Sequence, residues 1–141
     1  MRVAAIALLV GSLCVAACDD SGDLNLVPSA FGTFVLVTVD GNALPAVIVD
    51  SVSPPLTIRA LSGNIVLNAN NTFSDLARLE QTAGGIITTS TRSCTGTWSS
   101  IGNTLTFVEA STTNCGRTFT AILNGNTLAA SILGVPATFL R

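Results

Sequence analysis

The chain has 141 residues, with six arginines, no lysine, no histidine and eight acidic residues, for a formal charge of −2. That length accounts for one small domain, and a hydrophobic content of 48% excludes a disordered chain. The acidic balance argues against a nucleic-acid partner, because such binding needs a basic face. Without histidine the chain lacks the commonest metal ligand and general base.

The N-terminus combines a positive start with a short apolar run. Met1-Arg2 is followed by the apolar residues 3–10 and then by Val15-Ala16-Ala17-Cys18. The run is shorter than the roughly 20 apolar residues of a transmembrane helix, but it suits the apolar region of a secretory signal. An ordinary cleaved signal and a buried N-terminal helix are the alternative interpretations.

The last four of these residues resemble the lipobox of bacterial lipoproteins. The resemblance implies a lipoprotein signal peptide over 1–17 and a lipidated Cys18 as the first mature residue. The polar residues that follow indicate a flexible tether over 18–30. The expected location is the bacterial cell envelope, with the chain anchored by its lipid to the inner or outer membrane.

The rest of the chain has the pattern of β-strands separated by tight turns. Stretches such as Thr104–Phe107 and Thr118–Ala121 alternate polar and apolar residues, as strands with one wet and one dry face do. Residues that favour tight turns recur every 8–12 positions. The predicted turns are Gly41-Asn42, Ser53-Pro54-Pro55, Gly63-Asn64, Ala69-Asn70-Asn71, Gly84-Gly85, Gly102-Asn103, Ser111 to Gly116, Gly125-Asn126 and Gly134.

This spacing predicts an all-β fold: an up-and-down antiparallel meander of about eight to ten strands over residues 31–141. Closure into a barrel removes the exposed sheet edges of such a meander. A sandwich is the alternative, but it needs long crossover connections that the sequence does not offer. We therefore expect a closed β-barrel.

Three short segments resemble the small bacterial lipocalin-like lipoproteins: Phe31-Gly32-Thr33-Phe34, Gly96-Thr97-Trp98-Ser99 and the ending Thr138-Phe139-Leu140-Arg141. Lipocalins carry Gly-x-Trp on the first strand and an arginine near the last strand that stacks on that tryptophan. The resemblance therefore implies that Phe34, which replaces the tryptophan, and Arg141 cap one end of a lipocalin-like barrel. It also implies a small hydrophobic ligand.

Cys94 and Cys115 are the cysteines left once the signal is removed and Cys18 is lipidated. Two cysteines in an exported domain favour a disulfide, with two separate buried thiols as the alternative. If the strands reverse at 100–102, residues 92–94 lie opposite 108–110, which brings the two cysteines close. Two thiols without histidine fall short of a metal site.

Aromatic residues on the predicted inward faces are the candidates for a ligand pocket. Trp98 is interpreted either as a core residue or as a wall of such a pocket, with Gly96 leaving room beside it. Phe107 and Phe119 are the other candidates.

The acidic residues show no spacing that would pair two carboxylates on one strand face, and Arg78 with Glu80 is the expected surface ion pair. These acids are Asp40, Asp50, Asp75, Glu80 and Glu109. A serine nucleophile would lack a histidine or lysine base. We therefore expect no enzymatic activity, no catalytic residue and no cofactor.

Two functions are compatible with the sequence. The first is a membrane-anchored barrel that binds a small hydrophobic molecule. The alternative is a ligand-free structural or protein-interaction lipoprotein, an assembly accessory or an inhibitor of an envelope enzyme. Apolar side chains that fill the barrel interior would favour the alternative.

Overall fold

The structure is a computed structural model that describes residues 30–112 and 114–141. The predicted signal peptide, Cys18 and all of the predicted tether except Ala30 lie outside the described residues. The described chain forms ten strands: β1 (Gly32–Val39), β2 (Asn42–Ala43), β3 (Ala46–Val52), β4 (Pro55–Leu67), β5 (Thr72–Ala83), β6 (Ile86–Ile101), β7 (Thr104–Glu109), β8 (Thr118–Asn124), β9 (Thr127–Ile132) and β10 (Val135–Leu140).

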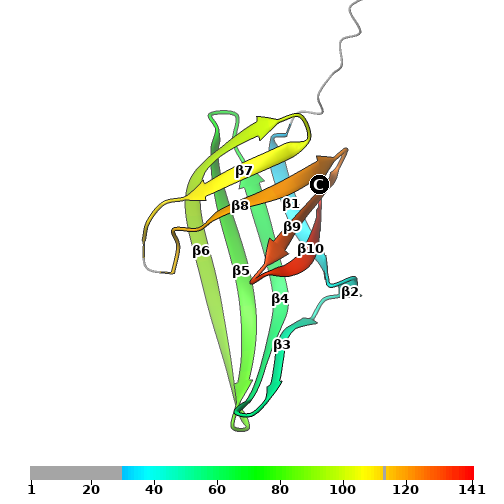
Figure 1. Ribbon diagram of the computed structural model, residues 1–141, viewed down its shortest axis with the longest axis vertical. Coiled ribbons are helices and arrows are strands. Elements are labelled where there is room, and N and C mark those ends of the chain that lie inside the picture. Colours follow the sequence, from blue (N-terminus) through cyan, green and yellow to red (C-terminus); the bar gives the residue numbers. More distant parts are fainter. Residues whose placement is uncertain (1–29, 113) are drawn as a thin grey trace, which may run out of the picture.

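Eight of these strands close into an antiparallel up-and-down barrel (Figure 1). From β4 to β10 each strand pairs with the next, and β10 pairs with β1. The ring closes where Gly32–Val35 of β1 pairs with Asn64–Leu67 of β4. β2 pairs with β1 and β3 pairs with β4, both outside the ring. The predicted all-β meander and its closure are confirmed.

Three barrel strands continue beyond the ring. β4, β5 and β6 have 13, 12 and 16 residues, whereas β7 has only 6. β6 pairs with β7 only from Gly96 to Ile101, so the first half of β6 has no partner strand on that side among the described residues. Together with β3, the free halves make a four-stranded sheet, which we call the sheet extension (residues 46–62 and 78–92). It forms the long lower part of the molecule in Figure 1.

Most predicted turns fall between strands, but the one at Gly63-Asn64 is wrong. Both residues lie inside β4, where Gly63 pairs with Ala77. A Cβ on Gly63 would lie 3.1 Å from the Leu76 carbonyl oxygen and 3.4 Å from a Leu36 methyl group. The glycine therefore permits a close approach within the sheet instead of a chain reversal, a common use of glycine inside strands. The first predicted turn is also displaced by one residue, to Asp40-Gly41.

The barrel interior is packed with apolar side chains. Seven large ones are less than 2% exposed: Phe34, Val39, Leu67, Phe73, Leu105, Phe107 and Leu128. They come from five different strands, β1, β4, β5, β7 and β9, so the core extends across the ring. Burial of such side chains, each stabilising by about 1.5–3 kcal/mol, is the main driving force for this fold.

Candidate functional site

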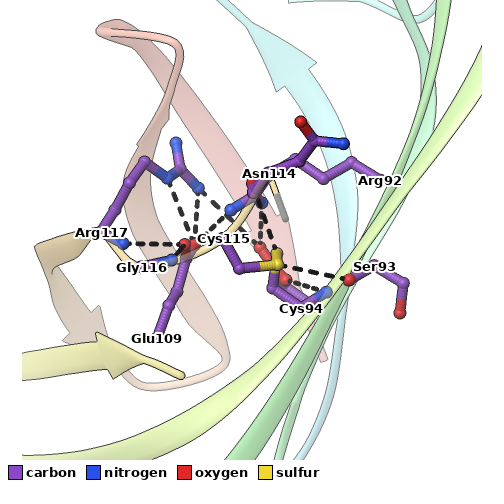
Figure 2. Close-up of a disulfide and its surroundings, with 9 residues drawn as sticks. Arg92, Ser93, Cys94, Glu109, Asn114, Cys115, Gly116 and Arg117 are labelled. Carbon is purple, nitrogen blue, oxygen red and sulfur yellow. Dashed lines mark hydrogen bonds and ion pairs between the residues drawn. A yellow bond between two sulfur atoms is a disulfide. The ribbon is translucent and has the colours of Figure 1, made fainter. Parts of the chain in front are cut away.

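Four charged side chains meet where the barrel passes into the sheet extension. Asp75 comes from β5, Arg92 from β6, Glu109 from the end of β7, and Arg117 from the residue before β8. Arg92 donates from Nη1 to Asp75 Oδ2 (2.8 Å) and from Nη2 to Glu109 Oε1 (2.5 Å). Arg117 Nη2 donates to the same Glu109 oxygen at 2.9 Å. We call these four residues the charge cluster; Figure 2 shows Glu109 between the two arginines.

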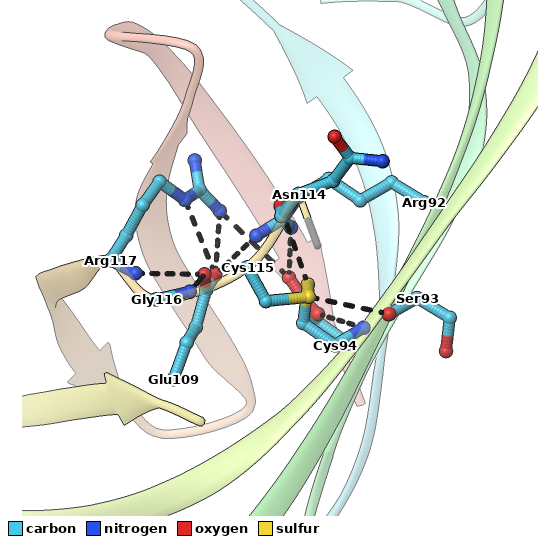
Figure 3. A network of polar contacts seen from close by, with 9 residues as sticks. Arg92, Ser93, Cys94, Glu109, Asn114, Cys115, Gly116 and Arg117 are labelled. Atoms are coloured by element: carbon cyan, nitrogen blue, oxygen red, sulfur yellow. Dashed lines mark hydrogen bonds and ion pairs between the residues drawn. A yellow bond between two sulfur atoms is a disulfide. The ribbon is translucent and has the colours of Figure 1, made fainter. Parts of the chain in front are cut away.

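The carboxylates of the cluster also bind the backbone. Glu109 Oε2 accepts the N–H groups of Gly116 and Arg117, both at 3.0 Å, and Asp75 Oδ1 accepts the N–H of Cys94 at 3.0 Å. Arg92 Nε donates to the carbonyl oxygen of Asn114 at 3.1 Å. The cluster thereby fastens the β7–β8 loop to β6, as the dashed lines in Figure 3 trace.

The Glu109 side chain is completely buried, and its ionisation reflects its partners. Burial alone would raise its pKa, but the hydrogen bonds from Arg117 and Arg92 outweigh that effect and lower the pKa of Glu109 from 4.5 to about 2. Burial alone would lower the pKa of Arg92, but the hydrogen bonds and the charges of Glu109 and Asp75 outweigh burial and raise this pKa. Glu109 is therefore ionised as a carboxylate and Arg92 as a guanidinium cation at neutral pH.

This arrangement is suited to a structural role. Its two positive and two negative charges cancel, and every buried side-chain nitrogen and oxygen among the described residues has a hydrogen-bond partner. A carboxylate whose pKa is about 2 is a poor general base at neutral pH. Glu109 also lies within 4.8 Å of the sulfurs of Cys94 and Cys115, but these sulfurs are bonded to each other and the carboxylate is held by arginines. The group offers no thiolate ligand.

The structure contains the predicted Cys94–Cys115 disulfide, with a Cα–Cα distance of 5.8 Å. The register expected around it is wrong by about three residues. The chain reverses at Gly102-Asn103, so that Gly96 lies opposite Glu109 and Thr97 opposite Val108. Cys94 therefore lies beyond the end of β7, and the disulfide fastens the β7–β8 loop to β6 beside the charge cluster (Figure 2).

At the opposite end of the barrel, Arg141 lies over Phe34, with its guanidinium carbon 5.3 Å from the ring centroid. Arg141 Nη1 also donates to the Phe31 carbonyl oxygen at 2.6 Å, and Nη2 to Asn126 Oδ1 at 3.2 Å. The two residues proposed from the lipocalin resemblance as a barrel-end cap are thus in contact, and the arginine ties the last strand to the first.

Of the three predicted pocket residues, Trp98 and Phe107 are buried in the core, and Phe119 is partly buried and packs against it. Phe107 and Phe119 stack with centroids 4.7 Å apart, and Phe73 meets the Phe107 ring edge-on at 5.0 Å. Trp98 is buried in the core, with its ring edge-on to Phe31 and its Nε1 donating to the Asn68 carbonyl oxygen at 3.3 Å.

The room expected beside Gly96 is occupied. A Cβ there would lie 2.1 Å from the Val108 carbonyl oxygen and 2.7 Å from the Phe73 ring. Gly96 thus allows β6 and β7 to approach closely beneath the Phe73 ring, and it opens no space for a ligand beside Trp98.

Two hollows accompany this architecture. A cavity of about 50 Å³ borders the charge cluster; Leu79, Ile132, Leu133 and Phe139 line it together with Arg92 and Arg117. A more open depression of about 300 Å³ lies between the two hairpin turns at the tip of the sheet extension. None of the three predicted pocket residues lines either hollow.

The charge cluster was not predicted because its members lie on four different strands or strand ends. A signal was nevertheless present: Asp75, Arg92 and Glu109 each occupy the same strand face as a core residue two positions away, respectively Phe73, Cys94 and Phe107. The expected surface pair was also placed wrongly. Glu80 pairs with Arg59, its direct neighbour across β4 and β5, at 3.4 Å.

Comparisons with protein-family models, with curated proteins and with solved structures found no match for this chain. In the described ranges, 30–112 and 114–141, no helix is long and apolar enough to cross a membrane.

Proposed function

We propose that this protein is a lipoprotein of the bacterial cell envelope, with a lipocalin-like barrel that acts through contacts with protein. Cys18 carries the lipid anchor, residues 18–30 are the tether, and the barrel of residues 31–141 is held at the membrane surface. The lipobox-like residues Val15–Cys18 support the anchor, and the eight-stranded barrel supports the lipocalin-like assignment.

The filled barrel interior is the observation that carries the choice of protein contact over small-molecule binding. Small-molecule sites usually enclose about 300–1,000 Å³. The cavity that borders the charge cluster has only about 50 Å³, room for a few water molecules, and the rings of Phe107 and Phe119 stack on each other instead of lining it.

A small hydrophobic ligand is the second candidate, and one observation favours it. The cavity is lined mostly by apolar side chains, among them Leu79, Ile132 and Leu133, and Leu133 belongs to a turn at the barrel end. Separation of that turn from β4 and β5 would enlarge the cavity toward the size of an acyl chain.

Two measurements test the proposal with the full-length chain in a bacterial host. Metabolic labelling with an alkyne fatty acid should tag the protein, and Cys18→Ala should remove the tag; a tag that persists in this variant contradicts the anchor. Native mass spectrometry after incubation with envelope lipid extract should give the mass of the lipidated chain alone. A discrete added mass that organic solvent releases would favour the small-molecule candidate instead.

A further inference from the structure

The first half of β6 is an exposed sheet edge. Residues 86–94 pair with β5 on one side, and among the described residues no strand pairs with the other side. Six consecutive residues, Ile86–Thr91, are exposed on both faces of the strand, with Ile86 at 69% and Ile87 at 66%. The backbone N–H and C=O groups along this edge are in position to accept another strand.

The other edge of the sheet extension differs in ways that oppose pairing. β3 carries the charged Asp50, its register shifts between Val47 and Val49, and Pro45 and Pro54 lie beside its two ends. Charges, irregular register and prolines are the devices by which proteins protect sheet edges. The segment Ile86-Ile87-Thr88-Thr89-Ser90-Thr91 has none of them. One edge of the same sheet is protected, and the other is open.

We propose that this open edge, β6 residues 86–91, pairs antiparallel with the same edge of a second copy of the chain, so that the two sheet extensions join into one eight-stranded sheet. The segment is compatible with self-pairing because it carries no charge: a two-fold axis near Thr88 or Thr89 places threonine, serine and isoleucine opposite one another without like charges. The next charge along β6, on Arg92, is already bound by Asp75 and Glu109.

The charge cluster lies at one end of the open edge with which the second copy would pair. β7 runs beside β6 up to the pair Gly96–Glu109, and beyond it the disulfide and Arg92 hold the β7–β8 loop against β6. An incoming strand would continue the line of β7 along residues 86–91. The cluster and the disulfide thereby end the barrel wall at a defined place and leave the edge beyond it uncovered.

Anchoring is compatible with this pairing and strengthens it. β1 begins opposite Leu67, at the far end of β4 from the sheet extension, so the two tethers leave from the outer ends of the pair. The chain from Cys18 to Ala30 spans at most about 45 Å, enough for both copies to reach one membrane when the pair lies along its surface. A six-residue edge buries little area, so the pairing is weak in solution and is promoted by confinement to the membrane. Only the promotion of pairing by the membrane rests on the proposed function; the pairing itself does not.

The test is cysteine cross-linking of the full-length chain in the envelope of a bacterial host. Single cysteines are placed at each position from 84 to 91, and Val47→Cys on the protected edge is the matched control. Under two-fold antiparallel pairing, each step from the axis moves a residue about 7 Å further from its own copy. Cross-linked dimer on non-reducing gels should therefore peak at Thr88→Cys or Thr89→Cys, several-fold above Val47→Cys, and decline in both directions.

Other cross-linking patterns overturn the proposal. A maximum at 84–86 indicates contact through the tip, a cross-link to a different protein indicates another partner for the edge, and a yield equal to that of Val47→Cys at every position indicates that the edge stays unpaired. In a second variant, Thr89→Lys places like charges across the axis and should abolish the cross-link of Thr88→Cys, whereas Val47→Lys should leave it unchanged. The fatty-acid and native-mass measurements report on the proposed function separately, so the two can fail independently.

Discussion

Arg92 and Glu109 are joined by a 2.5 Å hydrogen bond between Nη2 and Oε1, across the place where β6 and β7 stop pairing. Pairing between β6 and β7 ends at Gly96, which lies opposite Glu109. Arg92 lies four residues before Gly96 on β6, and its side chain extends to Glu109 at the end of β7. The contact therefore fastens the end of the barrel wall to the beginning of the sheet extension. Its energetics can be tested directly.

Replacement of Arg92 should be far more costly than replacement of an exposed arginine. Arg92→Leu leaves the buried Glu109 with one of its two arginines and removes the arginine that donates to Asp75. This loss is expected to lower the free energy of unfolding by about 3–5 kcal/mol. The matched control is Arg59→Leu, which breaks the exposed pair with Glu80 and should cost at most about 1 kcal/mol. Equal losses in chemical denaturation would contradict the structural role of the charge cluster.

Stability should fall in acid because of Glu109. Its pKa is depressed in the folded protein, so the stabilisation is fully present above the unfolded value of 4.5 and is lost as the pH falls toward about 2. The loss attributable to this group is on the order of 3 kcal/mol, from the difference between 4.5 and about 2. Denaturant titrations between pH 6 and pH 2 measure it. The Glu109→Gln variant should be less stable at pH 6 and show a shallower decline; an identical decline would assign the acid sensitivity to other groups.

Removal of the disulfide should weaken the protein without abolishing the barrel. Cys94 and Cys115 are 21 positions apart, and closure of a loop of that size stabilises by about 3 kcal/mol. The double variant Cys94→Ala/Cys115→Ala should lose that amount in denaturant titrations and keep its strand signal in circular dichroism. Addition of a reductant to the unmodified protein should reproduce the loss, and a reductant should have no effect on the double variant.

Two glycines inside strands should respond differently to alanine. Gly96→Ala places a methyl group 2.1 Å from the Val108 carbonyl oxygen, so β6 and β7 must separate, at a cost of about 3 kcal/mol or more. Gly63→Ala meets its closest atom at 3.1 Å and should stay within about 1 kcal/mol of the parent. Thermal unfolding of both variants measures the difference. Similar midpoints would mean that the close β6–β7 approach at Gly96 does not limit packing.

The parts of the fold that follow from local pattern were predictable from sequence. Alternation in Thr104–Phe107 assigns Leu105 and Phe107 to one face, and both are buried. Short turn signals such as Gly102-Asn103 and Gly125-Asn126 mark chain reversals where they occur in the structure. The Cys94–Cys115 pairing was predictable because these are the only two cysteines of the predicted domain, residues 31–141.

The parts that depend on register were not predictable in the same way. The predicted register of β6 against β7 is wrong by three residues. This error is enough to hide the proximity of Arg92, Glu109 and Asp75, because their contacts run diagonally across three strands. The sequence pattern predicts a turn at Gly63, because a glycine that permits close packing inside a strand has the same local sequence signal as one in a hairpin.

The sequence by itself determined the class of fold, because a side-chain period of two and regularly spaced turn residues act through local geometry alone. Tertiary structure decided where the barrel ends. β6 is 16 residues long and β7 only 6, and nothing local to either strand sets the place where their pairing stops. That place is held by the charge cluster and the disulfide, which join residues distant in the chain. It leaves the Ile86–Thr91 edge uncovered, because no neighbouring segment of the described chain extends far enough to pair with it.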